Sequence, residues 1–290
     1  MKILKIILTT LALSIITACG GGGSATTQGS ISGTVTKGPM SNATVTAYAI
    51  NNGQTGTQIA TATTAANGSF SMTMGSYAGP VMLQVSGGTY TDEATGTIMN
   101  MAPGDVMTAV MPTIMPGAAI SGIQVTPVTA MAQTMAQHMS GGMTDTNIAA
   151  ANTAMGTYFT VNDILHTPPM NPLVTNSWSG ASIDAQNYGM VLAAMSQSAK
   201  TINMTVSSAF VTAMMSDASD GVMNGKMGAN QISMSMGGMM GTSNMASMAG
   251  TSSLATAMTG FTNSAANASG LTTTDMAALI QKLTNSSGQI

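Results

Sequence analysis

Residues 69–74 read Ser-Phe-Ser-Met-Thr-Met, and this alternation indicates the fold class of the first part of the chain. Phe70, Met72 and Met74 fall on one face of an extended strand, because successive side chains of a strand point to opposite sides. The Asn-Gly pair at 67–68 is typical of the tight turn that precedes such a strand.

Short runs of the same kind, separated by Gly, Pro and Asn residues, continue on both sides of this stretch. They predict strands at 30–36, 44–49, 57–63, 69–74, 81–85, 97–101 and 106–114. Seven short strands with turn residues between them are typical of a small sandwich of two sheets. We therefore expect a seven-stranded β-sandwich over residues 30–117.

The hydrophobic period changes from two to that of a helix after residue 117. Thr126 followed by Pro127 is a typical helix start, and the Gly pair at 141–142 ends that helix. Further helices are predicted from about 144 to 159, 182 to 202, 206 to 217, 252 to 267 and 272 to 283. Residues 223–250 are rich in Gly, Ser, Asn and Met without a period, which predicts a low-complexity loop. We expect a multidomain β + α protein in which an irregular helical bundle over 118–290 follows the sandwich.

The composition excludes several classes of function. Only 5% of the 290 residues are charged, none is an arginine, and methionine occurs 31 times. Beyond residue 18 four lysines face nine acidic residues, a net charge of −5, so the chain lacks the basic patches that nucleic acids require. Without arginine, phosphate substrates are equally unpromising. No stretch after the first 18 residues holds 18 consecutive apolar residues.

The first 18 residues have the pattern of an export leader. A positive start with Lys2 and Lys5 precedes the apolar run 6–16, and residues 16–19 read Ile-Thr-Ala-Cys. This ending resembles the lipobox of bacterial lipoproteins, which implies cleavage before Cys19 and acylation of that cysteine with diacylglycerol and an amide-linked fatty acid such as palmitate. Several acyl chains together anchor a protein stably in a bilayer.

The residues around Cys19 predict the destination of the protein. An aspartate directly after the cysteine would resemble an inner-membrane retention signal, but this position is Gly20. We therefore expect the protein in the outer membrane. Residues 19–29 then form a flexible, lipid-anchored tether of Gly, Ser and Thr. Because Cys19 is the only cysteine, a disulfide framework and any cysteine-based metal site are excluded.

Residues 30–90 resemble a known module. The matching segments are Gly33-Thr34-Val35, Gly38-Pro39, Ala43-Thr44-Val45-Thr46-Ala47-Tyr48, Ala60-Thr61-Ala62-Thr63-Thr64, Asn67-Gly68-Ser69-Phe70 and Gly75-Ser76-Tyr77. Together they resemble the carboxypeptidase regulatory-like domain, a transthyretin-like (prealbumin-like) β-sandwich. The resemblance implies a spacer or binding platform without catalytic residues of its own. The whole chain resembles uncharacterised Met-rich lipoproteins of environmental bacteria, a likeness that implies no known activity.

A methionine cluster is the first candidate site. Eight methionines lie between residues 223 and 248. Thioethers are soft ligands that suit Cu(I) or Ag(I), and the spacing of Met234, Met236, Met239 and Met240 would suit such an ion. Methionine is enriched along the whole chain, however, where it replaces leucine as core filler. The cluster is therefore also interpreted as a flexible linker or as a sacrificial oxidation sink.

Three other groups of polar residues are candidate sites. His138 and His166 have no metal-ligand spacing, so two unrelated structural histidines are expected. Asp92 and Glu93 could support acid–base chemistry, but a solvated turn or a weak Ca²⁺ contact is the preferred interpretation. The loop 217–224 is only distantly similar to a calcium loop, and a helix-terminal turn is expected there.

These observations predict a non-enzymatic lipoprotein of the outer membrane or cell surface that serves as a structural or binding module of the cell envelope. The expected partners are the membrane, through the lipid anchor, and an unknown protein or other envelope component, but no nucleic acid. No cofactor is expected beyond the lipid on Cys19. The alternative is a soft-metal protein that binds Cu(I) or Ag(I) through residues 223–248.

Overall fold

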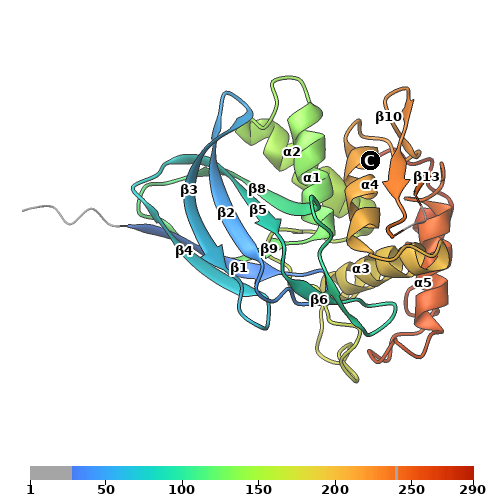
Figure 1. Cartoon of the computed structure of the whole chain (residues 1–290). Coiled ribbons are helices and arrows are strands. Elements are labelled where there is room, and N and C mark those ends of the chain that lie inside the picture. The colour runs from blue at the N-terminus through green and yellow to red at the C-terminus, as the bar shows by residue number, and fades with distance from the viewer. Residues whose placement is uncertain (1–27, 239–240) are drawn as a thin grey trace, which may run out of the picture.

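The protein combines several β-sheets with helices, as expected from the change of period along the chain (Figure 1). The computed structural model describes residues 28–238 and 241–290. Across these two ranges it contains six α-helices. The predicted leader 1–18, Cys19, the tether up to residue 27, and Met239 and Met240 lie outside the described residues.

Two sheets form the first layer of the molecule. A three-stranded sheet has the order β4–β1–β9, and a four-stranded sheet has the order β3–β2–β5–β8. The bounds are β1 Gly29–Val35, β2 Thr44–Asn51, β3 Gln54–Thr63, β4 Ser69–Gly75, β5 Gly79–Ser86, β8 Val106–Ile114 and β9 Ala119–Val125.

Both sheets contribute to one hydrophobic core. Phe70, Met72 and Met74 of β4 are buried together with Ile31 of β1 and Leu83 of β5, while the alternate residues of β4 remain exposed or half-buried. The face of the strand that was predicted from the alternation at 69–74 is therefore confirmed.

One predicted strand does not join either sheet. The stretch at 97–101 forms only the short β7 (Ile98–Asn100), which pairs with β6 (Thr89–Thr91) in a hairpin. The third strand of the smaller sheet is instead β9, which follows residue 117 and was expected to belong to the helical part. It runs parallel to β1. A Cβ on Gly33 would lie 1.9 Å from the Ile123 carbonyl oxygen, so this close pairing requires glycine at position 33.

Helices α1 (Pro127–His138) and α2 (Asp145–Phe159) cover the outer face of the four-stranded sheet. At the start of α1, the Thr126 hydroxyl accepts from Thr129 N–H and the Thr129 hydroxyl accepts from Thr126 N–H. This reciprocal cap confirms the helix start that was predicted at Thr126-Pro127.

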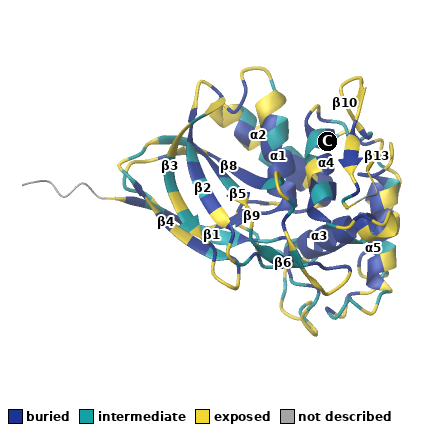
Figure 2. Ribbon diagram, in the orientation of Figure 1, coloured by how far each residue is buried: buried dark blue, intermediate teal, exposed yellow. Residues whose placement is uncertain are grey.

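The remaining helices form a second layer, whose core they share with buried side chains of α1 and α2. Their bounds are α3 Ile183–Thr201, α4 Ser208–Ala218, α5 Ser252–Thr262 and α6 Ala277–Thr284. Helix α3 is buried along most of its length between the sheets and α5 (Figure 2). None of the helices in the described part of the chain is both long and apolar enough to cross a bilayer.

The methionine-rich segment is packed into this second core, so the expectation of a low-complexity loop is wrong for its described residues. It forms two small hairpins, β10 (Lys226–Met227) with β11 (Asn230–Gln231) and β12 (Ser233–Ser235) with β13 (Thr242–Asn244). Four of its side chains are buried with the helices, namely Met223, Met234, Met236 and Met245. Ile232, Met234 and Met236 alternate with exposed residues along β12 and its flanks, whereas Met223 and Met245 lie outside this run, so the buried methionines follow no single period over the segment.

Candidate functional site

Asp92 and Glu93 lie in a buried charged cluster between the two layers. The Lys37 ammonium group, on the chain that leaves β1, donates to Glu93 Oε2 at 3.0 Å and lies 3.7 Å from Asp92 Oδ2. The Lys37 and Glu93 side chains are only 1% and 2% exposed. The turn at 92–93 was expected to be solvated, and that interpretation is wrong, because α3 and the start of α4 cover it.

Hydroxyl groups from the helices complete this cluster. Ser196 of α3 donates to Glu93 Oε2 at 2.6 Å and also accepts from the Lys37 ammonium group. Ser207, which precedes α4, donates to Asp92 Oδ2 at 2.5 Å. These three hydrogen bonds join the sheet layer to the helical layer, so the cluster fixes the position of α3 and α4 against the sheets.

Tyr90 forms the floor of the charged cluster. Its ring centre lies 5.0 Å from the Lys37 nitrogen, a favourable cation–π distance, and its hydroxyl lies 3.1 Å from Ser207 Oγ. The other Asp92 oxygen accepts from the backbone N–H groups of Ala94 and Thr95, both at 3.1 Å. The charged and polar groups of this cluster are therefore extensively hydrogen-bonded.

Electrostatics determine what this cluster can do chemically. Burial by itself would lower the pKa of Lys37, but the neighbouring Glu93 and Asp92 carboxylates outweigh it and raise the pKa above the usual value. Burial would likewise raise the pKa of Asp92, yet the Lys37 charge and the Ser207 and Thr95 hydrogen bonds lower it. Lys37 thus stays protonated, and a protonated lysine cannot take the proton that Ser196 would have to lose to become a nucleophile. The geometry favours a structural role.

The two histidines are engaged separately. His138 Nδ1 lies 2.8 Å from the Thr134 carbonyl oxygen within its own helix, and His166 Nδ1 lies 2.8 Å from Asp163 Oδ2. The His166 side chain is 51% exposed. Within residues 28–238 and 241–290, no three His, Cys, Asp or Glu side chains are grouped so that they could hold a metal ion.

Asp217 lies at the start of the loop 217–224, which has a distant similarity to a calcium loop, and it holds that loop by hydrogen bonds. It is buried at the end of α4, and its Oδ1 accepts from the backbone N–H groups of Asn224 at 2.9 Å and Gly225 at 2.6 Å. Burial raises the pKa of Asp217 to about 6, although these hydrogen bonds oppose the shift. The carboxylate thus serves the helix-terminal turn that was predicted there.

Of the four methionines selected as soft-metal ligands, the structure describes two. Met234 and Met236 are both buried in the helical core, and Met234 also reaches the floor of a groove. Their burial shows that these thioethers contribute to core packing, so the interpretation of the cluster as a flexible linker is wrong for Met234 and Met236. Their capacity for Cu(I) stays a prediction.

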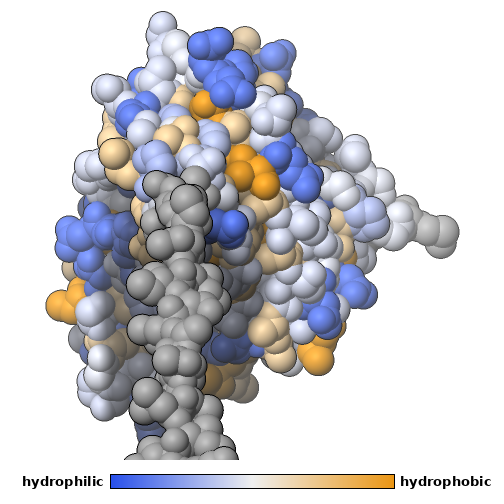
Figure 3. Space-filling view, turned by 90° about the vertical axis from the view of Figure 1, so that its left-hand side faces the viewer, coloured by the Kyte–Doolittle hydropathy of each residue, from blue (hydrophilic) through white to orange (hydrophobic). Residues whose placement is uncertain are grey.

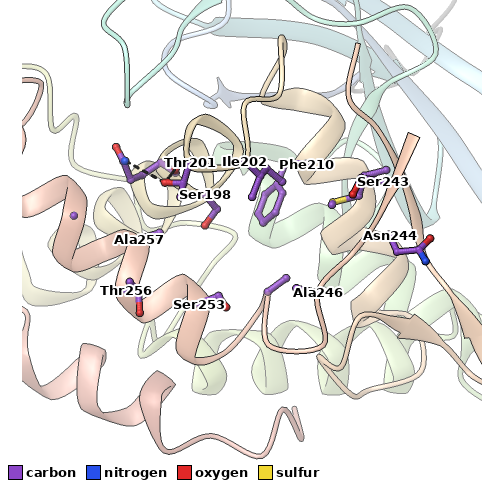
Figure 4. Close-up of a pocket in the computed structure, with 14 residues that line it drawn as sticks. Ser198, Thr201, Ile202, Phe210, Ser243, Asn244, Ala246, Ser253, Thr256 and Ala257 are labelled. Atoms are coloured by element: carbon purple, nitrogen blue, oxygen red, sulfur yellow. Dashed lines mark hydrogen bonds between the residues drawn. The ribbon is translucent and has the colours of Figure 1, made fainter. Parts of the chain in front are cut away.

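Sequence reasoning missed the groove, which lies between α3, α5 and the β12–β13 hairpin and encloses about 460 Å³ (Figure 4). We call it the α3–α5 groove; its lining includes Ser198, Phe210, Met234, Ala249, Ala257 and Gly260. A volume of several hundred cubic ångströms with a mainly apolar lining is typical of small-molecule sites. The only sequence signal was a run of small residues on one face of α5.

Comparison with family models, with curated proteins and with solved structures finds no match to the chain.

Proposed function

We propose that the protein is a non-enzymatic binding module of the cell envelope, anchored to the outer membrane through lipid on Cys19. The observation that carries this proposal is the α3–α5 groove together with its position. Strand β1 begins at one end of the molecule, whereas α5 and the β12–β13 hairpin lie at the opposite end (Figure 1). A tether attached before β1 would hold the groove away from the bilayer.

The surface at the β1 end supports an added lipid anchor. In the view toward this end, the hydrophobic side chains to either side of the grey trace lie among hydrophilic ones (Figure 3). Apolar residues that lie among polar ones are normal on a soluble surface and bind membranes weakly. Acyl chains on Cys19 would supply the missing apolar contact.

The sheet layer would act as the spacer of this module. The seven strands of the two sheets suit a transthyretin-like sandwich, the architecture implied by the resemblance over residues 30–90. The cluster around Lys37 supports rigid attachment, because its hydrogen bonds link this spacer to α3 and α4.

Metabolic labelling with an alkynyl palmitate tests the anchor. The wild-type protein should incorporate the label and fractionate with outer membranes, whereas Cys19→Ser should do neither. Wild-type protein without label would contradict the lipoprotein assignment. Turnover against a hydrolase panel, lost in Glu93→Gln or His166→Ala, would contradict the non-enzymatic assignment.

Soft-metal binding is the second candidate function. Met223, Met234, Met236 and Met245 all belong to the core of the helical layer, which gives that core several thioethers of the kind that Cu(I) prefers. Because this segment is part of the core, the suitable variant is Met234→Leu/Met236→Leu rather than a deletion. Titration of Cu(I) against a competing chelator should show binding that this double variant weakens. No binding, or binding unchanged in the variant, would eliminate this candidate.

A further inference from the structure

The α3–α5 groove has a buried, apolar floor and an exposed rim. Phe210, Met234 and Ala257 are buried at its base, whereas Ser253 and Gly260 are exposed at its mouth (Figure 4). A ligand that enters would therefore place an apolar part against an aromatic ring and a thioether, and it would meet hydroxyl groups on the way in.

Among residues 28–238 and 241–290, two polar atoms on α3 residues of the groove lining have no hydrogen-bond partner, and each exposes less than 1 Å² of surface. They are the hydroxyl oxygen of Ser198, a side chain that is 9% exposed, and the side-chain carbonyl oxygen of Gln197. A buried polar atom without a partner destabilises the fold, so a ligand group that pairs with it, once the Ser198 or Gln197 side chain turns toward the groove, gains binding energy. Together these atoms offer one donor and one or more acceptors, which match a ligand hydroxyl or amide.

Charge is missing from the groove. None of the described side chains that line it is ionisable, and its polar residues are serine, threonine, asparagine and glutamine. An ion moved into such a site would lose its hydration without gaining an opposite charge. The lining therefore selects against carboxylates, phosphates and amines.

From these three features we propose that the α3–α5 groove binds an uncharged amphiphile, with an apolar body on Phe210 and Met234 and a hydroxyl or amide group hydrogen-bonded to Ser198 and Gln197. This inference rests on the proposed function in one respect, because it names the class of ligand that the proposed binding module would take. It does not depend on the lipid anchor.

A methyl NMR titration tests the site with four probes of equal chain length: 1-hexanol, 1-chlorohexane, hexanoate and hexylammonium. The whole protein, as cells produce it, is held in nanodiscs of uncharged lipid with ¹³C-methyl methionine, and Met234→Leu assigns the Met234 signal. We expect 1-hexanol to shift this signal saturably. Hexanoate and hexylammonium should bind at least about tenfold more weakly.

Two variants locate the ligand. Ser198→Ala should weaken 1-hexanol binding by about three- to tenfold while leaving 1-chlorohexane binding unchanged, because only the alcohol uses this hydrogen bond. Gly260→Leu should abolish binding of both by filling the mouth, where a Cβ would have Gln197 Cγ as its nearest neighbour at 3.9 Å. Ser264→Ala is the matched control, since the Ser264 hydroxyl is also buried and unpartnered in the described chain but does not line the groove.

Three results would overturn the inference: no saturable shift with 1-hexanol, hexanoate binding as tightly as 1-hexanol, or unchanged affinity in Gly260→Leu. A thermal melt of each variant checks that it is folded. If 1-hexanol does not bind, the result of palmitate labelling at Cys19 is unaffected. If Cys19 is not labelled, the titration is unaffected. The two proposals are therefore tested separately.

Discussion

Replacing Lys37 with methionine tests how the two layers are held together. The substitution keeps the length and apolar stem of the side chain but removes the ammonium group that Glu93 contacts at 3.0 Å and Asp92 approaches at 3.7 Å. Two carboxylates then remain at a buried site without a positive partner. Breaking a buried ion pair from one side destabilises proteins by about 3–5 kcal/mol. This is a large part of a total stability of about 5–15 kcal/mol.

The pH dependence of this loss follows from the pKa shifts. In the wild type the pKa of Asp92 is lowered, so its contribution to stability is present above the ordinary value of 3.8 and is lost as the pH falls through its folded pKa. The pKa of Lys37 is raised, so its contribution is present below 10.5 and is lost as the pH rises through its folded pKa. Without Lys37, burial raises the pKa of Asp92, and protonation then relieves the unpaired charge. The difference in stability between Lys37→Met and the wild type should therefore shrink as the pH falls from 7 to 4.

Urea unfolding at pH 4, 5.5 and 7, followed by tryptophan fluorescence and circular dichroism, measures this difference. Lys226→Met is the matched control, because Lys226 is exposed on β10 and its loss should change stability by less than about 0.5 kcal/mol. Adding Glu93→Gln to Lys37→Met should restore part of the lost stability, since it removes one of the unpaired charges. A loss below about 1 kcal/mol at pH 7, or a difference that does not change with pH, would refute the reasoning.

Three further changes have defined outcomes. Asp217→Asn should raise the unfolding free energy at pH 7.5 by up to about 3 kcal/mol, because the folded pKa of about 6 lies above the ordinary 3.8, and wild-type stability should rise as the pH falls from 7 to 4. Urea midpoints at pH 4.5 and 7.5 measure this, and equal midpoints in the wild type would contradict it. Gly33→Ala should destabilise by about 1–3 kcal/mol or more, because its Cβ would collide with the Ile123 carbonyl oxygen. Gly260→Ala should instead stabilise by about 0.5–1 kcal/mol, since it lies in a helix where a Cβ would fit without a clash, its nearest neighbour being Gln197 Cγ at 3.9 Å. Thermal melts compare each alanine variant with the wild type, and melting temperatures equal to that of the wild type would contradict both expectations.

The elements with a clear local period could be predicted from the sequence. The alternation at 69–74 gave the buried face of β4 correctly, because a strand that is buried on one side places every second residue in the core. The start of α1 was likewise predictable, because Thr126 and Pro127 satisfy local requirements of a helix terminus. These features depend on neighbours within a few residues.

Two features could not be predicted from local patterns: the pairing of β1 with β9, and the packing of the methionine-rich hairpins. Strand β9 reaches β1 only after a long crossover, and Gly122 interrupts its alternation, so no local pattern assigns it to the smaller sheet. In residues 223–250 the buried Ile232, Met234 and Met236 alternate over only five residues, and Met223 and Met245 lie outside this run, so the pattern is too short to predict their packing. The flexible methionine side chains fill a core of irregular shape.

By itself, the sequence determined the mixed β and α class, the locally capped helix starts and a chain poor in charge. Only the tertiary structure decided that Asp92 and Glu93 are buried against Lys37, 55 or more residues away in the chain, under hydroxyl groups from Ser196 and Ser207. It also decided that side chains from α3, α4, α5 and the β12–β13 hairpin enclose one groove. The physical reason is that hydrogen-bond and capping patterns act over a few residues, whereas burial and ion pairing depend on which distant segments fold together.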